Sequence, residues 1–346
     1  MSISTNGDST SRHTTIVAEL SANHGHRLET AIATVRAAHE AGADAIKIQT
    51  YTPDTITIDC DNEFFQIKHG TIWDGTTLYK LYVKAYTPWD WHEPIRDEAI
   101  RLGLQFFSTP FDPTAVEFLE KLSVPCYKIA SFEITDIPLI ELAASKKKPI
   151  IISTGIATIG EIDEAVQACR RVGNDDITLL KCTSAYPAPV EDANLATMAN
   201  MRDAFGVKVG LSDHTMGSAV SIAAVALGAC LIEKHFIIDR AIGGPDASFS
   251  MEPKEFRTMV EAIRDVEKSI GRVSYNQPDF PINGRAFSRS LFVIKDMRAG
   301  EIFCKANIRS IRPGDGLPPA SINKILGKSA RCDISRGTPL AWDLID

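Results

Sequence analysis

The chain has 346 residues, of which 44% are hydrophobic and 23% are charged, a balance typical of a soluble globular protein. This length accommodates one large domain and a smaller one. The net charge of -7 argues against nucleic acid or an anionic membrane as a general partner, and no apolar run reaches the ~18 residues that a transmembrane helix needs.

The first 13 residues are polar and lack the apolar segment of a secretory signal, so we expect a flexible tail there. The seven cysteines are an odd number without metal-binding spacing. Cys126, Cys182 and Cys230 lie in strand-like runs, where a free thiol acts as a small apolar filler. These features predict a protein of the reducing cytoplasm.

Apolar, β-branched runs alternate with helical patterns as far as about residue 270. The runs predict eight strands, at residues 15–19, 45–49, 104–108, 126–130, 150–154, 177–181, 207–211 and 229–233. Helical spacing fills most of the intervals, for example residues 29–41, 94–102 and 161–172. Eight such units predict a (β/α)₈ TIM barrel over residues 14–272. No G-x-G-x-x-G follows the first strand, which argues against a dinucleotide-binding domain.

A long insertion, residues 52–91, follows the second predicted strand. It contains six tryptophan and tyrosine residues, and Tyr79, Tyr82 and Tyr86 have the spacing of a helix face. A long loop on the catalytic face of a barrel usually shapes substrate access. The alternative is a packed lid whose aromatic side chains touch no ligand.

Residues 273–284 are polar and rich in proline, which predicts a linker. The remaining residues, 285–346, predict a small domain with short strands at 289–294 and 328–334. A segment this short has little core of its own. We therefore expect it to dock on the barrel or on the barrel of a neighbouring subunit.

Polar residues stand where nearly every predicted strand stops, at the end where barrel enzymes build their active sites. Buried polar groups cost free energy unless they are satisfied, so their convergence favours a functional site over helix capping. The candidates in chain order are Glu19, Lys47, Gln49, Thr109, Lys128, Ser131, Ser153, Ser184, Tyr186, Ser212, His214 and His235.

His214 and His235 close the last two predicted strands. Two imidazoles from neighbouring strand ends can share one metal ion and leave positions open for substrate. Two lysines and several hydroxyls without a P-loop suit a small phosphorylated anion. An enol phosphate that meets a metal-activated aldehyde would use this whole set, with Glu19 as a general acid or base.

The motifs at the strand ends resemble those of the sialic acid synthase family. They are Val17-Ala-Glu-Leu-Ser-Ala-Asn-His-Gly, Phe107-Ser-Thr-Pro-Phe, Tyr127-Lys-Ile-Ala-Ser, Lys181-Cys-Thr-Ser-Ala-Tyr-Pro, Gly210-Leu-Ser-Asp-His-Thr and Glu233-Lys-His-Phe. The tail resembles that family's antifreeze-like (SAF) domain through Ile311-Arg-Pro-Gly-Asp-Gly, and residues 71–92 most resemble the branch that makes pseudaminic acid.

The resemblance implies condensation of phosphoenolpyruvate with an open-chain N-acylated amino sugar, 2,4-diacetamido-2,4,6-trideoxy-β-L-altropyranose in the pseudaminic acid branch, with phosphate released by C–O cleavage. It implies that His214 and His235 bind Mn²⁺ or Mg²⁺ and that Glu19 is the acid or base. Phosphoenolpyruvate would bind at Lys47, Lys128, Ser131, Ser153, Ser184 and Ser212. The sugar would bind at Gln49, Glu133, Tyr186 and Asp246. Arg312 would reach the partner subunit's site in a domain-swapped homodimer.

Three alternatives stay open from the sequence. The first is a sister synthase that makes N-acetylneuraminate or legionaminate. The second is an aldolase that forms a Schiff base on Lys47 or Lys128. The third is a non-catalytic sugar- or ice-binding protein, which the antifreeze-like tail suggests.

Overall fold

The computed structural model describes residues 13–68, 70–273, 275 and 284–346. The chain divides into two compact units between Gly271 and Arg272. The expected tail, apart from His13, and the expected linker, apart from residues 273, 275 and 284, lie outside the described residues. No helix in the described part is long and apolar enough to cross a membrane.

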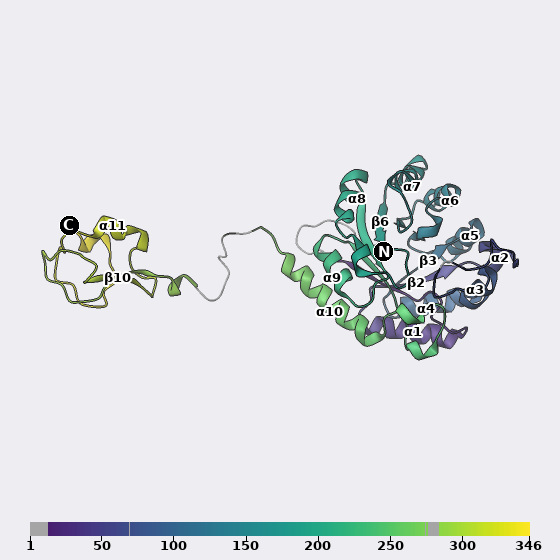
Figure 1. Cartoon of the computed structure of the whole chain (residues 1–346), viewed down its shortest axis with the longest axis horizontal. Helices are drawn as coiled ribbons and strands as arrows, with labels where there is room; N and C mark the ends of the chain where they lie inside the picture. The colour runs from purple at the N-terminus through teal and green to yellow at the C-terminus, as the bar shows by residue number, and fades with distance from the viewer. Residues whose placement is uncertain (1–12, 69, 274, 276–283) are drawn as a thin grey trace. The chain divides into compact units, whose positions relative to one another are not determined.

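The first unit is a closed barrel of parallel strands in sequential order, which confirms the predicted fold class (Figure 1). Each strand pairs with the next along the chain, and the last pairs with the first. The strands are β1 (Thr15–Glu19), β2 (Ala45–Thr50), β3 (Gln105–Pro110), β4 (Tyr127–Ile129), β5 (Ile150–Ser153), β6 (Ile177–Cys182), β7 (Lys208–Asp213) and β8 (Leu231–His235).

Helices surround the barrel and cover its apolar outer face (Figure 1). They are α1 (Leu28–Glu40), α4 (His92–Arg101), α5 (Pro113–Lys121), α6 (Ile137–Ser145), α7 (Ile159–Arg171), α8 (Thr197–Phe205), α9 (Ala219–Ala226) and α10 (Pro253–Ile270). In α7 the buried residues Ile162, Ala165, Val166 and Cys169 follow the i, i+3, i+4, i+7 spacing of one helix face. A capping box between Thr158 and Glu161 fixes where this helix begins.

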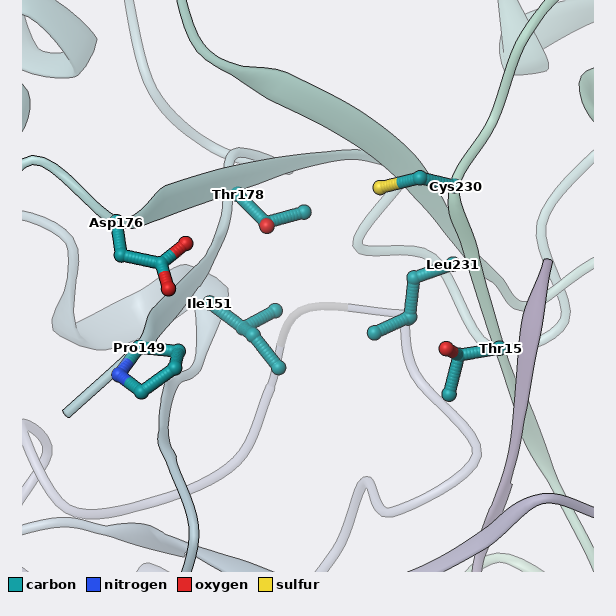
Figure 2. Close-up of a pocket in the computed structure, with 7 residues that line it drawn as sticks. All are labelled: Thr15, Pro149, Ile151, Asp176, Thr178, Cys230 and Leu231. Atoms are coloured by element: carbon teal, nitrogen blue, oxygen red, sulfur yellow. The ribbon is translucent and has the colours of Figure 1, made fainter. Parts of the chain in front are cut away.

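A layer of apolar side chains fills the lower half of the barrel interior. We call it the floor; its members are Val17, Ala45, Phe107, Cys126, Ile151, Leu180 and Leu231. A small cavity lies beneath it, at the N-terminal ends of β1, β5, β6 and β8 (Figure 2). Thr15, Pro149 and Cys230 are among its lining residues, and its acid, Asp176, is paired with Lys208 at 2.9 Å. This end of a barrel serves stability, because the chemistry of barrel enzymes lies at the opposite end.

The insertion between β2 and α4 contains two helices, α2 (Pro53–Ile56) and α3 (Leu78–Ala85). Tyr79 and Tyr82 lie on α3, and Tyr86 is the C-cap residue that follows it. Tyr82 packs edge-on against Tyr51 at the end of β2, with ring centroids 5.6 Å apart. These contacts make part of the insertion a packed lid.

The second unit has its own small core, built around Leu291, Met297, Phe303, Ile308 and Leu340. Its antiparallel strands are β9 (Ser290–Val293) and β10 (Ile308–Ile311), and its helix is α11 (Ile322–Ile325). The strand expected at residues 289–294 is therefore present, but the one expected at 328–334 is wrong. That segment makes only single bridges, each to a different partner, so no ladder forms.

Candidate functional site

Polar side chains from all eight strands line one pocket at the C-terminal end of the barrel. Because successive side chains of a strand point to opposite faces, residues at i and i+2 enter the barrel together. Eleven of the residues predicted from the sequence line this pocket: Glu19, Lys47, Gln49, Thr109, Lys128, Ser131, Ser153, Tyr186, Ser212, His214 and His235. Cys182 and Glu233 also line it, and the sequence reasoning missed both.

Two lysines and two carboxylates form a buried charged cluster at the base of the pocket. Lys47 Nζ lies 2.7 Å from Glu19 Oε2 and 3.8 Å from Glu233 Oε1. Lys128 Nζ donates to Glu233 Oε1 at 3.1 Å, and Ser212 Oγ donates to the same oxygen at 3.0 Å. The lysine side chains are only 3% and 2% exposed, so these charges interact in a medium from which water is largely excluded.

The two carboxyl groups differ in their affinity for a proton. Burial raises the pKa of Glu19 to about 7, although Lys47 opposes that shift. Burial acts in the same direction on Glu233, but Lys128 and Lys47 outweigh it and hold the pKa of that carboxyl at about 2. Near neutral pH the arrangement therefore keeps Glu233 ionised while Glu19 can exchange a proton, the separation expected of an acid–base group beside a fixed charge.

Serine hydroxyls surround the backbone of Gly155 at the end of β5. The Gly155 N–H donates to Ser131 Oγ at 3.1 Å. A Cβ at residue 155 would stand 2.2 Å from Ser184 Oγ and 2.9 Å from Ser131 Oγ, so only glycine fits without a shift. Ser153 Oγ is buried and has no hydrogen-bond partner among the described residues. We call Ser131, Ser153 and Ser184 the serine cradle; the unpartnered hydroxyl of Ser153 is available to an anion.

His214 and His235 lie side by side, with ring centroids 5.3 Å apart. His214 Nδ1 donates to the Thr183 carbonyl at 3.0 Å, which leaves the Nε2 lone pair free to bind a metal. His235 Nδ1 is buried without a hydrogen-bond partner, and Asp246 Oδ2 is 3.8 Å away. Burial and the neighbouring His214 lower the pKa of His235. These two rings fit a divalent ion as ligands.

In the described residues no group of three or more His, Cys, Asp or Glu side chains is arranged to hold a metal. An ion bound by the two imidazoles would thus keep open positions, as catalytic sites do. Cys182 Sγ is 3.7 Å from His214 Nδ1. Burial raises the pKa of this thiol, but His214 in its protonated form outweighs burial and brings the thiol pKa to about 7.

Four predicted residues lie outside the pocket lining. Ser184 is within 4.0 Å of Cys182 Sγ, and Asp246 accepts from Ser21 Oγ at 2.6 Å. Gln49 in turn donates to Ser21 Oγ at 2.9 Å and to Glu19 Oε1 at 3.2 Å, so Asp246 is connected to the pocket. The other two are Glu133 and Arg312.

Glu133 ends a 3-10 turn (Ser131–Glu133), and burial raises its pKa to about 7. Its Oε2 has no hydrogen-bond partner in the part of the chain that is described. Arg312 is an exposed residue of the second unit.

Aromatic rings connect the insertion to the two histidines. Tyr186 packs against His214, with centroids 4.3 Å apart, and Trp73 packs against Tyr186 at 5.5 Å. Trp73 Nε1 also donates to the Pro245 carbonyl at 2.9 Å, in the loop after β8. The insertion therefore reaches the mouth of the pocket through Trp73, although other aromatics of the insertion pack as a lid.

Two family models and several curated relatives match most of the chain. The model of the NeuB family matches residues 34–275, and the model of the SAF domain matches residues 288–346. The pseudaminic acid synthase of Helicobacter pylori is 49% identical over 96% of this chain and 97% of that protein. The N,N'-diacetyllegionaminic acid synthase of Legionella pneumophila is 38% identical over 96% of this chain and 94% of that protein.

A solved structure has the same architecture. The N-acetylneuraminic acid synthetase of Leptospira borgpetersenii, in complex with citrate, superposes with a TM-score of 0.69 at 30% identity. The match covers 77% of this chain and 88% of that one.

Proposed function

Because the chain belongs to the NeuB family, we propose that it condenses phosphoenolpyruvate with 2,4-diacetamido-2,4,6-trideoxy-β-L-altropyranose, in its open-chain form, to make pseudaminic acid. C3 of phosphoenolpyruvate forms a bond to the aldehyde carbon, one water molecule adds at C2, and phosphate leaves with the bridging oxygen. The products are a nine-carbon 2-keto acid and inorganic phosphate. The enzyme is thus a C–C bond-forming transferase.

The serine cradle with Lys47 and Lys128 is the observation that carries the proposal. Phosphoenolpyruvate has a phosphate and a carboxylate, and the pocket offers them two cations and the unpartnered hydroxyl of Ser153. Both lysines are already paired with carboxylates, which favours electrostatic binding over Schiff-base chemistry. Borohydride trapping with substrate would distinguish the two, since only a Schiff base would be trapped.

A divalent ion, Mn²⁺ or Mg²⁺, is the proposed cofactor, held by His214 and His235. When bound, such an ion polarises a carbonyl oxygen as a Lewis acid. Glu19 is the proposed acid or base: with a pKa of about 7 it can give a proton to the former aldehyde oxygen or take one from the attacking water. Lys47, 2.7 Å away, keeps this carboxyl oriented and stabilises its ionised form after the proton leaves.

The mouth of the pocket supports a 6-deoxy, diacetamido sugar. Trp73 and Tyr186 present aromatic surface beside His214, and such surface favours the three methyl groups of this sugar. Gln49, Glu133 and Asp246 are the proposed partners for its polar groups. The higher identity to a pseudaminic acid synthase, 49% against 38% for a legionaminic acid synthase, favours this sugar over that of the sister enzyme.

We also propose a homodimer in which Arg312 completes the partner subunit's site. Opposite charges support docking: residues 285–346 carry a net charge of +5, and residues 14–272 carry −11. The seven cysteines are free, in keeping with the proposed cytoplasmic location.

Product analysis of the purified chain is the direct test. The expected result is a nine-carbon keto acid by mass spectrometry from the diacetamido sugar, and label in phosphate when the bridging oxygen is ¹⁸O. A control with Glu19→Gln should form little product. An equal or higher kcat/KM with N-acetylmannosamine would move the chain to the sialic acid branch, and binding without turnover of any sugar would favour the non-catalytic alternative.

A further inference from the structure

A second buried ion pair lies directly behind the two histidines. Asp213 immediately precedes His214, and Lys234 immediately precedes His235. Because side chains alternate along a strand, Asp213 and Lys234 point out of the barrel while Ser212 and Glu233 line the pocket. Asp213 and Lys234 are also direct partners in the register of β7 and β8.

The pair is buried, and both carboxylate oxygens of Asp213 accept two hydrogen bonds each. Lys234 Nζ donates to Asp213 Oδ2 at 2.9 Å and to the Thr215 carbonyl at 2.5 Å, and both side chains are 1% exposed. Asp213 also accepts from the Thr215 backbone N–H at 2.9 Å, from Thr215 Oγ1 at 2.8 Å and from Ser221 Oγ of α9 at 2.6 Å. The network therefore joins the ends of β7 and β8, the turn after β7 and one helix.

Such a network is a costly way to stabilise a barrel wall. Taking two charges out of water offsets most of their attraction, and replacing a buried pair by neutral side chains is often close to neutral for stability. The best-attested role of a buried ion pair is to specify one arrangement of the chain segments that carry it. Here each charged residue is bonded along the chain to one candidate metal-binding histidine, so a change in the pair displaces the two rings relative to each other.

We infer that the Asp213–Lys234 ion pair sets the spacing and orientation of the His214 and His235 imidazoles, which makes both charged residues positioning residues of the site. The inference rests on the proposed metal site. Groups that orient metal ligands typically contribute 10–100-fold to metal affinity, so about that loss is expected when the pair is broken.

The test measures Mn²⁺ binding to the full chain, by electron paramagnetic resonance of free Mn²⁺, without substrate. Lys234→Met should raise the Kd for Mn²⁺ by about 10–100-fold. Lys148→Met is the control, because it removes a half-buried lysine that is paired with Glu120 at 2.5 Å near the opposite end of the barrel. It should lower the melting temperature and leave Mn²⁺ affinity unchanged.

A double variant, Asp213→Asn with Lys234→Met, separates positioning from stability. It keeps the shape of both side chains and removes both charges, so its melting temperature should recover toward that of the parent while its Mn²⁺ affinity stays low. If Lys234→Met does not fold, the Mn²⁺ affinity of the double variant tests the inference by itself. Parent-like affinity in it, or in a folded Lys234→Met, would overturn the inference.

The parent and His235→Ala distinguish this failure from failure of the proposed function. If the parent binds Mn²⁺ and His235→Ala does not, the proposed metal site is supported, whatever result the Lys234 variants give. Parent protein that binds no Mn²⁺ at these histidines would remove the metal site, and the inference with it.

Discussion

Gly155→Ala tests the serine cradle with the smallest possible change. The added Cβ would stand 2.2 Å from Ser184 Oγ, 2.9 Å from Ser131 Oγ and 3.1 Å from Cys182 Sγ, closer than such atoms normally approach. The backbone of Gly155 is not in the left-handed region, so the effect comes from space alone. Overpacking of this kind costs about 1–3 kcal/mol, which corresponds to about 5- to 150-fold in affinity.

Most of this cost should appear in the binding of phosphoenolpyruvate. The hydroxyls of Ser184 and Ser131 can rotate away from the new methyl group, so we expect the protein to fold but to lose the hydroxyl positions that an anion needs. Steady-state kinetics at saturating sugar should show KM for phosphoenolpyruvate raised by about 5- to 150-fold, with a smaller change in KM for the sugar.

Two further variants make the test decisive. Gly160→Ala is the matched control, because its Cβ would meet nothing within 4 Å and it lies in the first turn of α7. It should leave both KM values unchanged. Adding Ser184→Ala to Gly155→Ala removes the atom at 2.2 Å and should restore whatever part of the melting temperature Gly155→Ala loses. An unchanged KM for phosphoenolpyruvate in a folded Gly155→Ala protein would refute the assignment of the cradle.

Four other outcomes are expected. Glu19→Gln should lower kcat by about 10²–10⁴-fold, since it keeps the shape of the side chain and removes proton transfer; a value within about twofold of the parent would exclude Glu19. Chelation should abolish turnover, and Mn²⁺ or Mg²⁺ should restore it, whereas full activity after verified metal removal would contradict the cofactor. Mixing inactive Glu19→Gln and Arg312→Ala subunits should regain activity if Arg312 acts in trans, and no recovery despite proven exchange would favour action in cis. Burial lowers the pKa of His24 and of His92 from 6.5 to about 4. Because the unfolded chain binds more protons than the folded chain between these pH values, the free energy of unfolding should be highest above pH 6.5 and should fall by about 3 kcal/mol for each histidine as the pH approaches 4. Urea titrations of His24→Asn that keep the parent's entire pH dependence would contradict this.

The barrel could be predicted because short stretches of the sequence contain the patterns of its strands and helices. Each strand is a short apolar run, and each covering helix has a buried face with regular spacing, as in α7. The alternation of side chains along each strand also predicted most of the residues that line the pocket. The same rule could have found Glu233, which precedes His235 by two residues and so enters the barrel on the same side. The apolar run around Cys182 predicts a filler thiol, although Cys182 precedes Ser184 by the same spacing.

Other features depend on contacts between distant residues. Trp73 and Tyr186 are far apart in the sequence, and only the folded insertion brings their rings within 5.5 Å. The segment 328–334 looks like a strand locally, but its neighbours in the second unit offer single bridges instead of a ladder. The Asp213–Lys234 pair follows from the register of β7 and β8, which residue patterns do not specify.

The apolar floor has a consequence for the order of events. Lys47 is paired in register with Phe107 of the floor, so the lysines lie at the closed end of the pocket, whereas Tyr186 and Trp73 lie toward the mouth. In a pocket with one opening, the ligand that binds deepest enters first. If phosphoenolpyruvate binds at the lysines as proposed, we expect it to enter before the sugar, and we expect phosphate to leave after the nine-carbon product.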